Sequence, residues 1–256
     1  MQYGKAFSDA LQFMWGKGFL SPGGPEEVRE MLEGHDLRGR TVLDIGSGLG
    51  GIDVLLAGEH GAAEVVGIDV EPRLIEEARA LVRAAGLESK IRFDLVEPGP
   101  LPFADESFDA AFSKDAMVHI PGKDLLFAEV MRVLKPGGHF IAADWLWKEG
   151  AESSPSVKAW MAAIPLTFAF TTLPQAEEAL ARAGFTNLRI RDCRAALQAS
   201  NRREMEALEG PLRNKLAEVV GAEMAASRLT SARGRQGALD AGELLPVHFS
   251  AMKPLG

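Results

Sequence analysis

The sequence predicts an α/β protein built on a mostly parallel sheet with helices on both faces. Two observations support this class. Short apolar segments alternate with helix-like segments from residue 41 to residue 145, which is the pattern of a parallel sheet. The chain has 256 residues, 46% of them hydrophobic, and this suffices for one large domain with added helices.

The N-terminal part predicts two helices. Residues 5–20 form a short amphipathic pattern that the cluster SPGGP at 21–25 ends. Residues 25–34 begin with a proline and two glutamates, which are typical of a helix start. We therefore expect an N-terminal helical cap over residues 1–36.

The alternating part predicts the sheet and its covering helices. Helix patterns separate successive apolar strands, and a glycine ends the helix over 72–86. The expected strands are TVLDIG (41–46), EVVGIDV (64–70), IRFDLV (91–96), FDAAFS (108–113) and HFIAADW (139–145), and the expected helices cover 50–60, 72–86 and 125–134.

The alternation of strands and helices stops after residue 145. An apolar and aromatic stretch at 155–173 is followed by one more helix and strand, and the chain is then mostly helical before a last strand. The expected elements are a helix over 174–184, a strand over 188–193, helices over 200–228, a polar connection over 233–245 and a strand over 246–252. We expect one sheet domain over 37–256 with helical insertions at about 148–173 and 197–245.

Composition excludes several classes of function. The net charge is −8 and no basic stripe occurs, so nucleic acid is not an expected partner. No apolar run approaches the roughly 18 residues of a membrane span, and no signal peptide is expected. Cys193 is the only cysteine, so we expect no internal disulfide and a cytoplasmic protein. The histidines show no ligand spacing, so no metal is expected.

A glycine-rich segment, VLDIGSGLGG, joins the first strand to the next helix. Gly46, Gly48 and Gly50 permit a tight turn and let a ligand approach the backbone closely. The segment also contains GxGxxG through Gly51, a weak signal that is compatible with a dinucleotide-binding fold.

Three acidic residues lie at successive strand ends around this loop. Asp44 stands two residues before the first glycine, which suits a cationic ligand better than a pyrophosphate. Asp69 ends the second strand and is placed to accept hydrogen bonds from ribose hydroxyls, and Glu97 follows the third strand, where we expect the adenine. The alternative is that Asp44 caps a turn and Asp69 is an ordinary strand-end acid.

These motifs resemble the class I S-adenosylmethionine-dependent methyltransferases. VLDIGSGLGG, VVGIDV, FDAAFSKDAMVHI and LFAEVMRVLKPGG match in order across residues 41–145, and Lys135–Gly138 matches the turn before strand five. The resemblance implies a Rossmann-like sheet, S-adenosylmethionine as cofactor, and insertions on the acceptor side. It implies cofactor contacts from Ser21, Asp44, Gly46, Ser47, Gly48, Gly50, Asp69, Val70, Glu97 and Ser113.

A narrower resemblance concerns the phosphoethanolamine methyltransferases. Gln2-Tyr3, the segment FMWGKGFLSPGG, and SKDAMVHI at 113–120 look like the N-terminus and the histidine segment of that family. In that family a tyrosine and a histidine form a dyad over the methyl donor. The resemblance therefore implies that Tyr3 and His119 form the dyad and that Asp115 lies near the acceptor.

The chain departs from that family where the acceptor's phosphate is expected. The family recognises its phosphorylated amine with several tyrosines, an arginine and a lysine, largely after strand five. Here Tyr3 is the only tyrosine, and no charge occurs between Trp160 and Leu173. An unpaired buried phosphate is prohibitive, so we expect an acceptor without one, although Arg233 or Arg235 could supply a late cation.

The sequence therefore predicts methylation of a small molecule, most simply at the nitrogen of an amine without a phosphate. His119, with an ordinary pKa of about 6.5, suits a general base. Trp145, Trp147 and Trp160 suit either a cationic nitrogen or core packing. The alternatives are O- or C-methylation of a more apolar acceptor, and a non-catalytic S-adenosylmethionine-binding protein. The acceptor, the number of methyl groups and the oligomeric state are left open.

Overall fold

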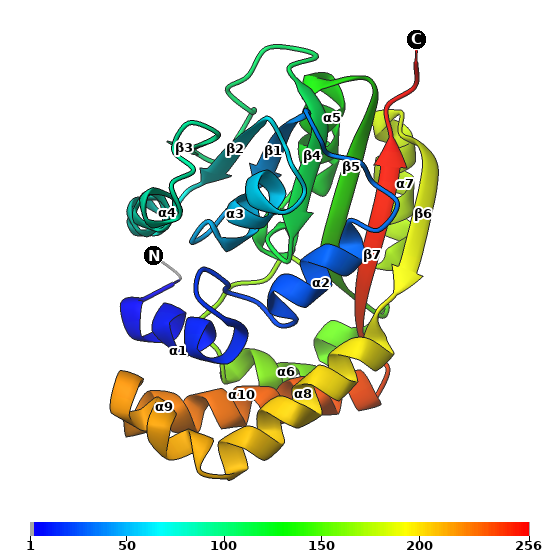
Figure 1. Ribbon diagram of the computed structural model, residues 1–256. Coiled ribbons are helices and arrows are strands. Elements are labelled where there is room, and N and C mark those ends of the chain that lie inside the picture. The colour runs from blue at the N-terminus through cyan, green and yellow to red at the C-terminus, as the bar shows by residue number, and fades with distance from the viewer. Residues whose placement is uncertain (1–2, 256) are drawn as a thin grey trace.

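The computed structural model describes residues 3–255, and these form a seven-stranded sheet with the order β3-β2-β1-β4-β5-β7-β6 (Figure 1). The first five strands are parallel, whereas β7 runs antiparallel to both of its neighbours. The α/β prediction is confirmed. The strands are β1 (Thr41–Ile45), β2 (Glu64–Asp69), β3 (Ile91–Leu95), β4 (Phe108–Lys114), β5 (Leu134–Trp147), β6 (Thr186–Asp192) and β7 (Leu244–Met252).

The helices fall into two groups, those that cover the sheet and those that gather beyond one end of it (Figure 1). Among the described residues no helix is both long and apolar enough to cross a bilayer. The helices are α1 (Lys5–Trp15), α2 (Gly24–Met31), α3 (Gly51–Gly58), α4 (Pro72–Ala85), α5 (Lys123–Val133), α6 (Pro155–Ala162), α7 (Leu173–Ala183), α8 (Arg194–Glu209), α9 (Leu212–Val220) and α10 (Ala222–Asp240), with the 3₁₀ turns η1 (Met117–His119) and η2 (Ala151–Ser153).

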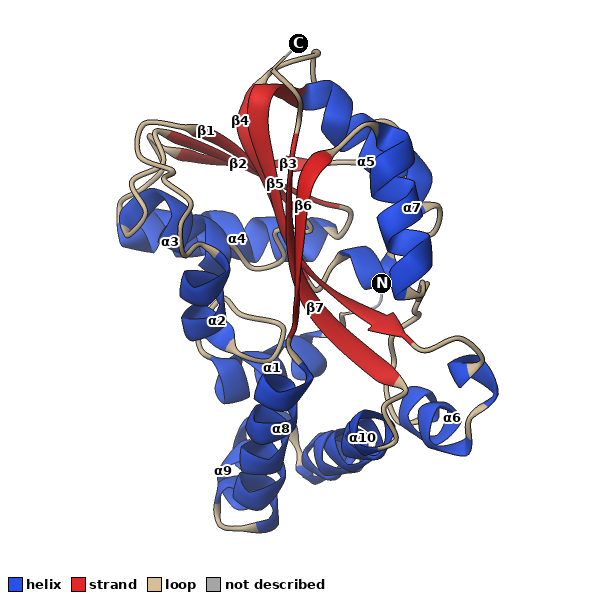
Figure 2. Ribbon diagram, turned by 90° about the vertical axis from the view of Figure 1, so that its right-hand side faces the viewer, coloured by secondary structure: helices blue, strands red, loops and turns tan. Residues whose placement is uncertain are grey.

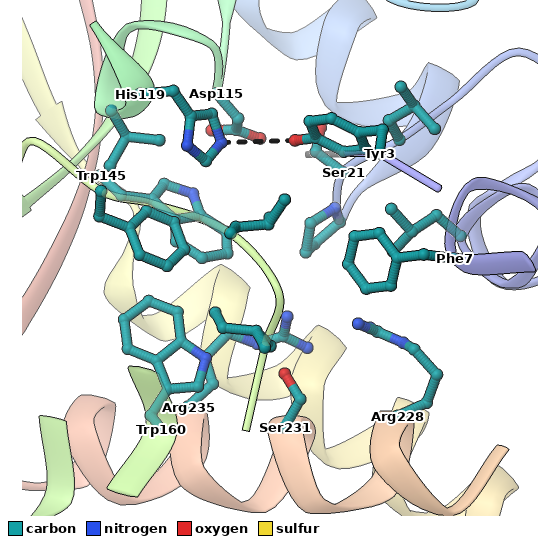
Figure 3. A pocket seen from close by; sticks show the side chains of 17 residues that line it. Tyr3, Phe7, Ser21, Asp115, His119, Trp145, Trp160, Arg228, Ser231 and Arg235 are labelled. Carbon is teal, nitrogen blue, oxygen red and sulfur yellow. Dashed lines mark hydrogen bonds between the residues drawn. The ribbon is translucent and has the colours of Figure 1, made fainter. Parts of the chain in front are cut away.

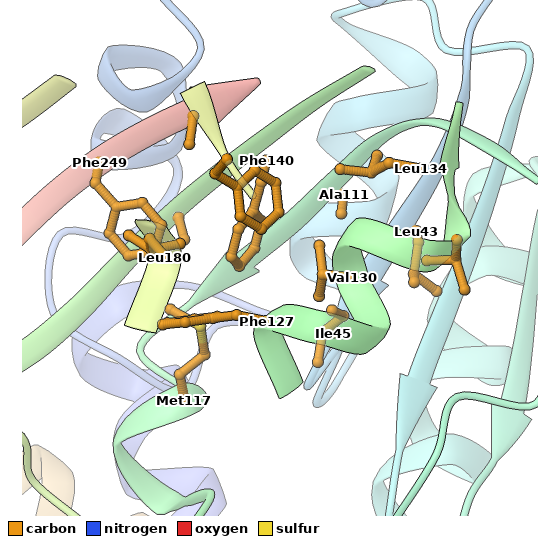
Figure 4. Packing of buried hydrophobic residues seen from close by; sticks show 14 of the residues in the cluster. Leu43, Ile45, Ala111, Met117, Phe127, Val130, Leu134, Phe140, Leu180 and Phe249 are labelled. Atoms are coloured by element: carbon orange, nitrogen blue, oxygen red, sulfur yellow. The ribbon is translucent and has the colours of Figure 1, made fainter. Parts of the chain in front are cut away.

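The hydrophobic core lies on both faces of the sheet because successive strand residues point to opposite sides. Val42 of β1 belongs to the face that α2, α3 and α4 cover, and Leu43 belongs to the face that α5 and α7 cover. On the second face Phe140 meets Phe127 and Phe249 edge to face, with ring centroids 5.9 and 5.3 Å apart (Figure 4).

A helical layer lies beyond the carboxyl ends of the parallel strands (Figures 1 and 2). There α1 packs through Ala10 and Met14 against α8, α9 and α10, while α6 packs through Trp160 against α8 and α10. Within the expected N-terminal cap, α1 thus joins this layer, whereas α2 joins the core beside the sheet. Ligands of open parallel sheets bind at this end of the strands, so the layer closes over the expected site.

Two details of the helical prediction are wrong. Residues 233–240 do not form a polar connection but the second half of α10. Two glycines misled the prediction, and the first has a packing role: a Cβ at Gly234 would lie 2.7 Å from the Cα of Trp160, so a glycine lets α6 approach α10 closely. The first helix ends at Trp15 rather than residue 20, because Gly16 turns the chain at φ 103°.

Candidate functional site

The glycine loop lies between β1 and α3 and is held by backbone hydrogen bonds. The N–H groups of Gly46 and Ser47 both donate to the carbonyl of Ile68, at 2.9 and 3.0 Å. Gly46 has φ 79°, and a Cβ there would overlap the side chain of Ala116, so this position needs a glycine. The N-terminal loop meets the glycine loop where Gly51 donates its N–H to the carbonyl of Gly18.

Asp69 stands at the end of β2, beside this loop. Its carboxylate accepts the N–H groups of Gly48 and Glu71, each at 2.9 Å, and burial raises its pKa. Val70 and Leu95, at the ends of two adjacent strands, are 52% and 50% exposed. Large apolar side chains left open beside a fixed carboxylate suit the flat ring and the ribose of a nucleoside.

The remaining strand-end acid lies further out. Glu97 is exposed, two residues beyond the end of β3. Leu95 was missed by the sequence prediction, although its signal was an apolar residue at the very end of a strand.

Asp44 is buried under the glycine loop together with a second acid, Asp53 of α3. The two carboxyl groups interact with each other, and no other described residue hydrogen-bonds the side-chain oxygens of either acid. Burial, with the nearby charge of Asp69, raises the pKa of Asp44 to about 7, and burial also raises the pKa of Asp53. Two buried acids without a cation are costly, so this place favours a positively charged ligand group. Asp53 was also missed, although an acid in the first turn after a glycine loop was its signal.

Two serines complete the floor of the site. Ser113 of β4 is buried and donates its hydroxyl to the carbonyl of Ile45 at 2.9 Å, which ties the ends of β4 and β1 together. Ser47 is 4% exposed, and its hydroxyl oxygen has no hydrogen-bond partner among residues 3–255.

Tyr3 and His119 lie together although 116 residues separate them in the chain. The Tyr3 hydroxyl is 3.3 Å from Nε2 of His119, and Nδ1 of His119 is 2.7 Å from the carbonyl of Thr167 (Figure 3). Because that carbonyl can only accept, Nδ1 carries the proton and Nε2 accepts from Tyr3 in the neutral ring. Arg73 of α4 holds the N-terminal segment by donating to the carbonyl of Tyr3. Gln2 lies outside the described residues.

Burial sets the protonation of both members of this pair. Burial is the main cause that lowers the pKa of His119, so the imidazole is neutral near pH 7. Burial, with Asp69 and Asp115, raises the pKa of the Tyr3 hydroxyl, so the phenol keeps its proton. The ring of His119 also stacks on Phe168 at 5.1 Å.

Lys114 joins the loop before α2 to the end of β4, and sequence reasoning gave it no role in the site. Its ammonium donates to Ser21 Oγ and the carbonyl of Pro22, each at 2.8 Å, and pairs with Asp115 at 2.6 Å and Glu27 at 2.9 Å. Burial opposes this charge, but the two carboxylates outweigh burial and raise the pKa of Lys114. Lys114, within SKDAMVHI, thus sets the positions of Ser21 and Asp115.

A cavity of about 50 Å³ opens between the dyad and α10 (Figure 3). Trp145 and Trp160 form its aromatic wall, whereas Trp147 stacks on Phe170 instead. Its far side consists of Arg228, Ser231 and Arg235 of α10.

These arginines correct one premise of the sequence analysis. The cavity beside the dyad does contain cations, because α10 brings Arg228 and Arg235 to it from outside the segment between Trp160 and Leu173. Arg233, the other candidate, is exposed and pairs with Glu209. Arg235 was one of the two late cations considered from the sequence, whereas Arg228 was missed because no local pattern shows which face of its helix meets the cavity.

The residues of the glycine loop fit S-adenosylmethionine. Asp69 offers a carboxylate at the strand end for a ribose, and Val70 and Leu95 offer apolar surface for an adenine. Ser47 has a buried oxygen without a partner among the described residues, and Asp44 interacts there only with another acid, Asp53, so an amino-acid group with a cationic centre would supply donors. No cluster of three potential metal ligands occurs in residues 3–255.

Comparison with known proteins agrees with this geometry. The sequence profile described as "Methyltransferase domain" matches residues 36–206. Phosphoethanolamine N-methyltransferase 1 of Arabidopsis thaliana is 38% identical over 133 residues, which are 52% of this chain and 26% of that protein. The chain thus spans about a quarter of that relative's length.

Solved structures extend the similarity to the whole chain. Phosphoethanolamine N-methyltransferase 2 of Haemonchus contortus, in complex with phosphomonomethylethanolamine and S-adenosylhomocysteine, has a TM-score of 0.91 and 25% identity, over 99% of this chain and 58% of that one. A putative sarcosine dimethylglycine methyltransferase from Galdieria sulphuraria shares the fold, with a TM-score of 0.82, 21% identity and 98% coverage of both chains.

The profile match covers more than half of the chain, and the fold, the glycine loop and the strand-end acids agree with it. The chain therefore belongs to the methyltransferase domain family: it is a class I S-adenosylmethionine-dependent methyltransferase that resembles the phosphoethanolamine N-methyltransferases.

Proposed function

We propose that the chain methylates a small amine that carries no phosphate. The observation that supports this most is the Tyr3–His119 pair, with 3.3 Å between the hydroxyl and Nε2, at the wall of the cavity. When bound, S-adenosylmethionine supplies a methyl group on a sulfonium that is open to in-line displacement. The protein has to position the acceptor, exclude water and remove one proton from the amine.

The dyad provides a route for that proton. In the proposal the acceptor N–H faces the Tyr3 oxygen, and Tyr3 passes its own proton to Nε2 of His119 as it receives the one from the amine. As the nitrogen took the methyl group from the sulfonium, which would leave as a neutral thioether, the proton of the amine would end on the imidazole of His119. Thr167 stabilises the imidazolium because its carbonyl already accepts from Nδ1.

Asp115 is proposed to orient the amine from a position beside the dyad (Figure 3). It takes φ 55°, a conformation that a non-glycine residue adopts only where its surroundings impose it. The imposing contacts are its ion pair with Lys114 and its backbone N–H bond to the carbonyl of Ala143. Trp145 and Trp160 add aromatic surface that suits a methylated, cationic nitrogen.

The cofactor contacts are proposed in the same way. Gly46, Gly48 and Gly50 form the turn that the cofactor approaches, Asp69 accepts from the ribose, and Val70 and Glu97 lie towards the adenine. Ser21, Asp44, Ser47 and Ser113 surround the amino-acid end. Ser21 is fixed for this role by its hydrogen bond from Lys114.

The charge of the pocket supports an acceptor without a phosphate. The Haemonchus relative binds a phosphorylated amine. Here the two pocket arginines share a buried glutamate, Glu204, which leaves less positive charge than a phosphate dianion requires. The cavity is also lined by the apolar residues Ile164, Leu166 and Phe168. They favour a second candidate function, which is O- or C-methylation of a more apolar acceptor.

The test is a panel of acceptors with S-adenosylmethionine, followed by mass spectrometry of the products and measurement of S-adenosylhomocysteine release. The panel holds small amines, phosphoethanolamine, phenols and isoprenoids. We expect methylated amines, with phosphoethanolamine turned over slowly. Turnover of phosphoethanolamine at the rate of the best amine would contradict the phosphate-free proposal, and donor binding without any product would favour a non-catalytic protein.

A further inference from the structure

The acceptor pocket has two chemically different ends, and its α10 end is charged. Arg228, Ser231 and Arg235 are spaced by three and four residues, so they form one face of α10 and point into the cavity (Figure 3). All three are at least 96% buried. The dyad stands at the opposite end of the cavity.

The two arginines are held by one carboxylate. Arg228 donates to Glu204 Oε1 at 2.7 Å, and Arg235 donates to Glu204 Oε2. Arg235 also donates its Nε–H to Asn201 Oδ1 at 2.6 Å, and Asn201 is fixed in turn by the carbonyl of Ala232. Two guanidinium groups against one carboxylate leave one positive charge unbalanced in a buried place.

One donor at this end remains without a partner. The Nε–H of Arg228 is buried and has no hydrogen-bond partner within residues 3–255. Ser231 lines the cavity one turn further along α10. Buried donors are almost always satisfied, so the Nε–H of Arg228 indicates a ligand group that accepts.

The nearest other acid does not balance this charge. Asp115 lines the same cavity, but its carboxylate pairs with the buried ammonium of Lys114 at 2.6 Å. Glu27, the other partner of Lys114, pairs with His248 as well. The α10 end therefore keeps its single positive charge.

We propose that Arg228, Ser231 and Arg235 bind a carboxylate of the acceptor, so that the substrate is a small amine carrying one negative charge, with its nitrogen at the dyad and its carboxylate at α10. A monoanion balances one positive charge, whereas a phosphate dianion leaves an excess negative charge in a buried site. A planar carboxylate also matches the flat edge of a guanidinium. The inference rests on the proposed N-methylation and narrows its substrate class.

The first test uses the wild-type chain. Glycine, β-alanine and γ-aminobutyrate, and their N-methyl derivatives, are each compared with the corresponding amide, which keeps size and amine but removes the charge. Phosphoethanolamine is added as the dianion. We expect kcat/KM for the best carboxylate to exceed that for its amide about tenfold to a hundredfold, the usual size of a lost charged hydrogen bond. Equal values for acid and amide, or a higher value for phosphoethanolamine, would overturn the inference.

The second test uses variants of α10. In Arg228→Gln the ratio of kcat/KM for carboxylate to that for amide should fall towards one, whereas Arg233→Gln, on the same helix but exposed, should keep it. Ser231→Ala should lower the ratio by a smaller factor and serves if Arg228→Gln does not fold. Because each ratio is measured on one preparation, a reduced folded fraction does not change it. An unchanged ratio in the folded pocket variants would refute the subsite.

Calorimetry separates the two proposals. Protein saturated with S-adenosylhomocysteine is titrated with the best carboxylate and its amide, so binding is measured without transfer. Carboxylates that bind but are never methylated would leave the α10 subsite in place and overturn the N-methylation. Amines that are methylated without any preference for a carboxylate would overturn the subsite alone.

Discussion

At the scale of single residues, Asp69 is the side chain on which cofactor affinity should depend most. Its carboxylate fixes the N–H groups of Gly48 and Glu71 and is the expected ribose acceptor. Asp69→Ala removes a charged hydrogen-bond partner, so we expect S-adenosylmethionine affinity to fall about tenfold to a hundredfold in calorimetry. Asp105→Ala, at an exposed acid paired with Arg132, should leave the affinity unchanged. Equal affinity in Asp69→Ala and wild type would argue against this placement of the ribose.

The dyad makes a second prediction at this scale. His119→Ala removes the proposed proton acceptor, and general acid–base contributions are about 10²–10⁴ in rate, so kcat should fall by that factor while donor affinity changes little. Tyr3→Phe removes the hydroxyl but keeps the ring, which lies 5.9 Å from that of Phe7, and should cost less. If the pair acts as a unit, the double variant should lose less than the product of the single losses.

The control for the dyad is His35→Ala, a histidine that faces His139 outside the acceptor cavity. It should leave turnover near that of wild type. If His119 serves only in packing, His119→Ala would lower the melting temperature while turnover per folded molecule stays near wild type. Melting curves and turnover on the same preparations therefore decide the role of His119.

At the scale of elements, Lys114 connects three segments: the loop before α2, α2 itself and the end of β4. Its side chain is 1% exposed, and its loss would leave Asp115 without its cation and Glu27 with His248 as its remaining cationic partner. Removing one member of a buried ion pair costs about 3–5 kcal/mol, so we expect Lys114→Met to lower the free energy of unfolding by about that amount in urea titrations.

Two further variants make that measurement specific. Lys135→Met breaks the ion pair between Asp109 and Lys135, whose side chain is 41% exposed. This change should lower the free energy of unfolding by about 0–1 kcal/mol. Adding Asp115→Asn to Lys114→Met removes the stranded charge and should restore part of the loss. A loss in Lys114→Met no greater than that in Lys135→Met would show that the ammonium is not a structural centre.

The elements also show what the sequence could and could not predict. The strand ends around Asp44 and Asp69 were predictable, because the spacing of apolar residues and the pattern of glycines are both local signals in the sequence. The second half of helix α10 was not, because its apolar positions follow no clear stripe and Gly234 is typical of a loop, although Trp160 packs on it here. The pocket arginines follow from that packing, which joins segments about 70 residues apart and leaves no local pattern.

At the scale of the whole molecule, one chain of buried charges crosses the fold from the site to the last strand. Asp115 and Lys114 of the central sheet connect through Glu27 of α2 to His248 of β7, with 2.8 Å between Glu27 Oε1 and His248 Nε2. The N-terminal helices are thus linked electrostatically to both the middle and the end of the sequence. Stability should therefore depend on pH through these groups.

His248 sets the alkaline side of that dependence. Burial alone would lower the pKa of His248, but Cys193 and Glu27 raise it to about 9, above the ordinary value of 6.5. A raised folded pKa means that the protonated ring stabilises the fold fully below about pH 6.5, and that this contribution is lost as the pH rises through about 9. At pH 6 we expect His248→Gln to unfold at a lower urea concentration than wild type. The difference between their urea midpoints should narrow steadily up to pH 10. His60→Gln, at a histidine outside this chain of charges, should show no such trend. A gap between wild type and His248→Gln that stays constant from pH 6 to pH 10 would show that the ring is uncharged in the fold and contributes only through packing.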